Sequence, residues 1–95
     1  MTESEDRQLI RLAQAGDQSA RDQLMQKWDP LCWSIAHQIK THPNYDIEDL
    51  VQVCRMALLK SIDNFDLIEY EHITSLATIA RTAMLRQASE YANRD

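Results

Sequence analysis

The chain has one glycine, Gly16, and two prolines, Pro30 and Pro43, among its 95 residues. A β-rich fold needs many tight turns, and glycine and proline are the residues that most often build them. No segment shows the sustained alternation of apolar and polar residues that is typical of a half-buried strand. These features predict an all-α fold, arranged as a compact bundle of four to five helices.

The clearest predicted helix lies in the segment from Asp46 to Asp66. The carboxylate of Asp46 can accept hydrogen bonds from free backbone amides, so we expect the helix to begin at about Ile47. Apolar residues then recur at intervals of three and four, which places them on one buried face: Ile47, Leu50, Val51, Cys54, Ala57, Leu58 and Ile62. The polar residues that face away from this stripe are Asp49, Gln52, Arg55 and Lys60.

Local signals mark the other helices. Gly16 suits a left-handed residue that ends a first helix, and Asp17 suits the cap of the next. Because proline is tolerated in a first turn but not in a helix interior, Asp29 and Pro30 leave two alternatives open up to about Lys40: one kinked helix or two helices. A final helix is outlined by Ile73, Leu76, Ala80, Ala83 and Met84.

Length and charge limit the functions that this chain can have. We expect one domain over residues 1–95, with its ends at 1–4 and 90–95 expected to fray. The net charge of -5 argues against binding nucleic acid by broad neutralisation of phosphates. Between Ile73 and Ser89 there is no acid, whereas Arg81 and Arg86 are present, so the last helix is the predicted nucleic-acid face.

Targeting and catalytic motifs are absent from the sequence. It has no apolar run long enough to cross a bilayer and no signal-peptide pattern, so we expect a cytoplasmic protein with no membrane partner. Cys32 and Cys54 form no CxxC motif and are expected to be buried thiols. No catalytic triad order, glycine-rich phosphate loop or HExxH pattern occurs, so we expect neither an enzyme nor a bound cofactor or metal.

Three segments carry a family resemblance: LIRLAQAGDQSARDQLMQKWDPLCWSIA, then DIEDLVQVCRMALLKSIDNFD, then ITSLATIAR. The DLxQ helix, the K-x-I-D-x-F-D corner and the TIAR segment come in the order and spacing that resemble region 2 of bacterial RNA polymerase sigma factors of the sigma-70 type. The resemblance extends from Leu9 to about Gln87. It implies a compact helical domain that binds core RNA polymerase and takes part in transcription initiation and minus-ten promoter recognition.

By this resemblance, the DLxQ helix binds the clamp helices of the largest polymerase subunit. Asp49 and Gln52 match the family's contact residues, and the neighbouring contact positions are Glu48, Val53, Arg55 and Leu59. Exposed acids and an amide can pair with a basic helical partner, while Val53, Met56 and Leu59 add apolar area. The family often has an acid at the position of Val53, a difference that is expected to weaken an ion pair or to alter which polymerase surface is preferred.

The resemblance also implies that the final helix holds the non-template strand of promoter DNA. The candidate DNA-binding residues are Tyr70, Ile79, Arg81 and Arg86. Splayed bases need aromatic or apolar platforms, and the family commonly supplies several aromatic residues. In an ungapped count these positions fall on residues that are not aromatic, namely Ile73, Leu76, Ile79 and Ala80. Their spacing predicts that at least two of Ile73, Leu76 and Ile79 belong to the core.

Three functions therefore remain open. The first is a sigma region 2-like protein whose region 4 function is missing or is supplied by a separate protein. The second is a sigma-like polymerase-binding regulator that does not melt promoters, and the third is a helical protein-interaction adaptor. A region 4-type partner and an anti-sigma factor are further candidate partners.

Overall fold

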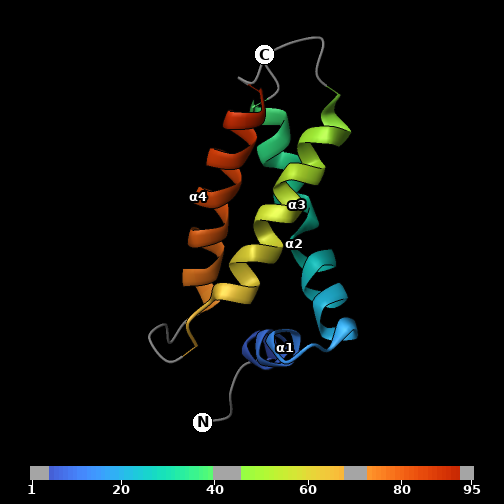
Figure 1. Ribbon diagram of the computed structural model, residues 1–95, viewed down its shortest axis with the longest axis vertical. Helices are drawn as coiled ribbons and strands as arrows, with labels where there is room; N and C mark the ends of the chain where they lie inside the picture. Colours follow the sequence, from blue (N-terminus) through green and yellow to red (C-terminus); the bar gives the residue numbers. More distant parts are fainter. Residues whose placement is uncertain (1–4, 40–45, 68–72, 93–95) are drawn as a thin grey trace.

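The computed structural model describes residues 5–39, 46–67 and 73–92. They form four α-helices, and no strand occurs among them: α1 (Glu5–Gln14), α2 (Gln18–Ile39), α3 (Ile47–Asn64) and α4 (Ile73–Ala92). Helices α2, α3 and α4 run along the long axis of the molecule, and α1 lies across one end of them (Figure 1). The predicted all-α bundle is confirmed, with four helices. Residues 41–45, whose polar sequence predicts a loop, lie outside the described residues, as do residues 1–4, where fraying is expected. In the segment 90–95, where fraying is also expected, residues 90–92 belong to α4 and residues 93–95 lie outside the described residues.

A Schellman motif connects α1 to α2. Gly16 has a φ of +105°, and its N–H donates to the carbonyl of Ala13 at 3.0 Å, while the N–H of Asp17 donates to Leu12 at 2.9 Å. The Oδ1 atom of Asp17 then accepts a hydrogen bond from the N–H of Ala20 at 3.0 Å, as a helix cap does. The predicted roles of both residues are confirmed.

The segment around Pro30 forms one helix, because α2 continues through the proline. Proline removes one backbone hydrogen bond from a helix interior. The residues on both sides of Pro30 nevertheless share one buried face, made of Ala20, Leu24, Cys32, Ile35 and Ala36. This common burial favours a continuous helix over a break, which settles the alternative that the sequence left open.

Helix α3 is the centre of the bundle and packs against each of the other three helices. It begins at Ile47 as predicted, and the Oδ1 atom of Asp46 accepts from the N–H of Glu48 at 3.0 Å. All the predicted stripe residues after Ile47 are buried: Leu50, Val51, Cys54, Ala57, Leu58 and Ile62. Phe65, immediately after the helix, is also buried. The sequence pattern thus identified the inner side of α3.

Side chains of α1 form hydrogen bonds with the C-terminal end of α3. The Nε2 atom of Gln14 donates to two carbonyls there, of Ile62 at 2.9 Å and of Phe65 at 2.8 Å. Arg7 donates through Nη2 to the carbonyl of Leu67 at 2.6 Å. Two exposed ion pairs, Arg21 with Asp63 and Lys27 with Asp6, connect α2 to its neighbours. Helix α1 is therefore an integral support of the corner where α3 ends.

Candidate functional site

One side of α3 stays in solvent while the other is buried. Glu48, Asp49 and Gln52 are exposed, Val53 and Leu59 are half-buried, and Met56 has an exposed fraction of 62%. We call this surface, made of Glu48, Asp49, Gln52, Val53, Met56 and Leu59, the α3 face. It combines acids and an amide with an unusually exposed apolar side chain, which is a composition suited to protein binding.

Arg55 borders the α3 face but is held by α2. Its Nε and Nη2 atoms donate to Asp29 at 2.7 Å and 3.0 Å, and Asp29 also accepts from Nε1 of Trp33 at 3.1 Å. The hydrogen bonds from Arg55 hold the pKa of Asp29 below its usual range. The structure thus brings Arg55 beside the other predicted contact residues, but its guanidinium is already engaged.

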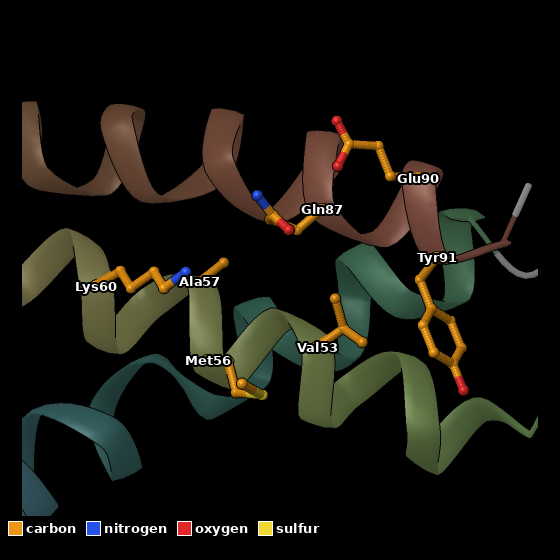
Figure 2. Close-up of a pocket in the computed structure, with 7 residues that line it drawn as sticks. All are labelled: Val53, Met56, Ala57, Lys60, Gln87, Glu90 and Tyr91. Atoms are coloured by element: carbon orange, nitrogen blue, oxygen red, sulfur yellow. The ribbon is translucent and has the colours of Figure 1, made fainter. Parts of the chain in front are cut away.

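A pocket of about 220 Å³ adjoins the α3 face on the side of α4. Figure 2 shows Val53 and Met56 on α3 to the left of the Tyr91 ring, which extends from α4 toward α3, whereas the carboxylate of Glu90 points away from α3. The remaining lining residues are Ala57, Lys60 and Gln87. The apolar part of the α3 face therefore continues into a hollow between two helices.

A second hollow, which we call the α3–α4 groove, lies further toward the C-terminal end of α3. It is lined by Ala57, Lys60, Ser61, Asn64, Phe65, Asp66, Ile79, Ala83, Arg86 and Gln87. Ile79 has an exposed fraction of 37%, so it is available to a ligand, whereas Leu76 is fully buried. Two cations, Lys60 and Arg86, and one acid, Asp66, line the groove. Apolar and cationic groups side by side suit a single nucleic-acid strand.

The other predicted DNA-binding residues are distributed differently. Arg81 is exposed on α4 but is not among the lining residues of the α3–α4 groove. Tyr70 and the side chain of Ile73 lie outside the described residues. The sequence did not indicate Asn64 or Gln87 as site residues, because only the packing of α4 on α3 brings them together. Trp28 and Trp33 pack against the core.

Among residues 5–39, 46–67 and 73–92, no group of three or more His, Cys, Asp or Glu could hold a metal ion. Cys32 and Cys54 are free and fully buried, and burial raises the pKa of their thiols to about 12 and about 11. None of the helices described is long and apolar enough to cross a membrane.

The structure is thus an all-α bundle whose central helix keeps acids, an amide and the apolar side chain of Met56 in solvent. Residues 24–93 match the family described as Sigma-70 region 2, so the chain belongs to the sigma-70 region 2 family. No solved structure matches the chain.

Several relatives are sigma factors. The chain is 40% identical over 67 residues to the RNA polymerase sigma-F factor of Bacillus subtilis (strain 168), which is 70% of this chain and 26% of that protein. The sigma-F factor of Priestia megaterium gives the same identity and coverage. A putative RNA polymerase sigma-G factor of Bacillus thuringiensis subsp. kurstaki is 41% identical over 61 residues, or 64% of this chain and 48% of that protein. The match spans about a quarter of the sigma-F factors.

Proposed function

We propose that this chain binds core RNA polymerase through the α3 face and has a non-enzymatic role in transcription initiation. The observation that carries the proposal is the solvent exposure of Asp49 and Gln52 on a helix whose opposite side is fully buried. Family membership supports it, as do the printed names of the relatives, which are RNA polymerase sigma factors. The partner surface that we propose is the pair of clamp helices in the largest subunit.

The chemistry of the α3 face defines how such a partner would be recognised. Glu48 and Asp49 offer negative charge, and Gln52 offers an amide that can both donate and accept. Met56, Val53 and Leu59 provide apolar area that a partner helix would bury. Complementary charge mainly sets orientation and the rate of association, whereas buried apolar side chains contribute more of the affinity. A basic amphipathic helix fits both requirements.

The double variant Asp49→Ala/Gln52→Ala tests the docking proposal. We expect its affinity for immobilised core RNA polymerase to fall at least about tenfold, because two central polar contacts are lost. The matched control is Asp22→Ala/Gln26→Ala, which removes an exposed acid and an exposed amide from α2. Equal binding by the double variant and the unaltered chain would refute docking through the α3 face.

For DNA, we propose that the α3–α4 groove holds the non-template strand of the minus-ten element. The cations Lys60 and Arg86 and the exposed Ile79 support this role. The net charge of -5 and the lack of a ring at Ile79 favour the alternative, a polymerase-binding regulator that does not melt promoters.

A region 4-type protein and an anti-sigma factor are proposed as further partners, and co-purification with candidate partners tests them.

Arg86→Ala distinguishes the two DNA alternatives. If the groove holds the strand, this variant should bind single-stranded minus-ten DNA more weakly, and the slope of log affinity against log salt should fall by about 0.7 for one lost phosphate contact. Arg81→Ala, on the same helix but outside the groove lining, should change neither quantity. Equal losses in both variants would place the strand along the α4 surface. No salt-sensitive binding by the unaltered chain would favour the regulator.

A further inference from the structure

Arg55 follows the acids Glu48 and Asp49 on α3. The segment from Ile47 to Arg55 contains two acids, Glu48 and Asp49, and no other cation. Arg55 lines one small pocket together with Glu48, Gln52, Val51 and Trp33. Its side chain is therefore close enough to influence the charge that the α3 face presents to a partner.

The position of the guanidinium is fixed by a residue outside α3. Asp29 on α2 accepts two hydrogen bonds from Arg55, at 2.7 Å and 3.0 Å, in the bidentate geometry that gives directional ion pairs. Trp33 donates a third hydrogen bond to the same carboxylate at 3.1 Å. The side chains of Arg55 and Asp29 are 30% and 31% exposed, so the pair is partly shielded from solvent. Asp29 itself therefore has little freedom to move.

Without Asp29, the guanidinium would have other acceptors within its pocket. The side-chain amide oxygen of Gln52 lies one turn before Arg55 on α3, and the carboxylate of Glu48 lies two turns before it. An Arg55 side chain bonded to either group would neutralise or occupy a contact that the α3 face offers. In either position the guanidinium would add positive charge beside a basic partner, which opposes association.

Resting on the proposed docking function, we propose that Asp29 is a positioning residue of the polymerase-binding surface. It holds Arg55 against α2, so that Glu48, Asp49 and Gln52 remain available to a basic partner helix. Asp29 lies outside the DLxQ segment, 26 residues before Arg55 in sequence. The Asp29–Arg55 pair therefore controls the charge of the α3 face from a different helix.

Asp29→Asn tests this role because it keeps the side-chain volume and an acceptor for Trp33 but removes the charge that holds Arg55. We expect its affinity for core RNA polymerase to fall about three- to tenfold at low salt, and the loss to shrink as the salt concentration rises. Asp29→Glu keeps the charge and should retain binding. The double variant Asp29→Asn/Arg55→Gln should bind more tightly than Asp29→Asn alone, because the released cation is gone.

The control is Asp63→Asn, which breaks a second ion pair between α2 and α3, that of Arg21 with Asp63. It should leave polymerase binding unchanged, and thermal melting of every variant reports its folding. The proposal is overturned if Asp29→Asn binds normally, if Asp63→Asn loses as much, or if the double variant binds no better than Asp29→Asn alone. Failure of the docking function itself is a different result, since Asp49→Ala/Gln52→Ala would then bind normally.

Discussion

Leu58→Ala is expected to lower the free energy of unfolding by about 2–5 kcal/mol. Leu58 is fully buried on α3, the helix that packs against each of the other three. Its truncation would remove apolar contacts and leave a cavity that the surrounding helices can fill only in part. The whole stability of a domain of this size is about 5–15 kcal/mol, so the variant should lose a large part of it. Urea denaturation followed by circular dichroism measures the change.

Met56→Ala is the matched control on the same helix. Met56 is two residues before Leu58 but has an exposed fraction of 62%, so its truncation should change the free energy of unfolding by no more than about 0.5 kcal/mol. We expect it to weaken polymerase binding several-fold instead, because it removes apolar area from the α3 face. A large loss of stability in Met56→Ala, or none in Leu58→Ala, would contradict the assignment of the two sides of α3.

Both thiols should resist modification in the native chain. Cys32 and Cys54 are fully buried, and burial raises their pKa from 9.0 to about 12 and about 11. The thiolate is the reactive form, so modification at pH 8 requires opening of the bundle. We expect the native chain to react with Ellman's reagent about a thousandfold more slowly than the chain in 8 M urea, given an unfolding free energy of at least about 5 kcal/mol. Rapid reaction of either thiol without denaturant would show that the core is open.

The same thiols should lower the stability of the bundle at alkaline pH. Their folded pKa values lie above the unfolded value of 9.0, so their contribution to stability is complete below pH 9. Above that pH the unfolded chain loses protons that the native chain keeps, and stability falls until the pH passes the folded values, about 11 and about 12. The variant Cys32→Ala/Cys54→Ala should show a shallower decline between pH 9 and 11 in urea denaturation. An unchanged decline would show that other titratable groups cause the loss of stability.

Local chemistry made much of the fold predictable. The positive φ of Gly16, the caps at Asp17 and Asp46 and the buried stripe of α3 all depend on residues within a few positions of one another. The exposure of Asp49 and Gln52 followed from the same periodicity, because a helix with one buried side must turn its other side to solvent. The sequence could not decide whether the helix continues through Pro30. The proline removes one local backbone hydrogen bond, whereas the apolar burial that outweighs this loss involves residues along the whole of α2.

Contacts between distant residues were not predictable in this way. The pairing of Asp29 with Arg55 joins two helices across 26 residues, and Gln14 reaches carbonyls 48 and 51 residues away. Sequence spacing gives the angle of a side chain around its own helix but not what a neighbouring helix places beside it. The α3–α4 groove has the same origin, since α3 and α4 each supply part of its lining. Arg55 was therefore expected as a contact residue, without any indication that Asp29 engages it.

The hydrogen bonds of Gln14 have a consequence for how relatives of this chain should be aligned and trimmed. The family match begins at Leu24, partway along α2. Helix α1 lies entirely before that point, yet its Ile10 and Ala13 are buried in the core and its Gln14 binds the carbonyls of Ile62 and Phe65. Phe65 in turn lines the α3–α4 groove. A shortened protein that begins at Leu24 would therefore lack the helix that supports one end of the groove. In relatives of this chain, substitutions in α1 should accompany substitutions in the residues that line the groove.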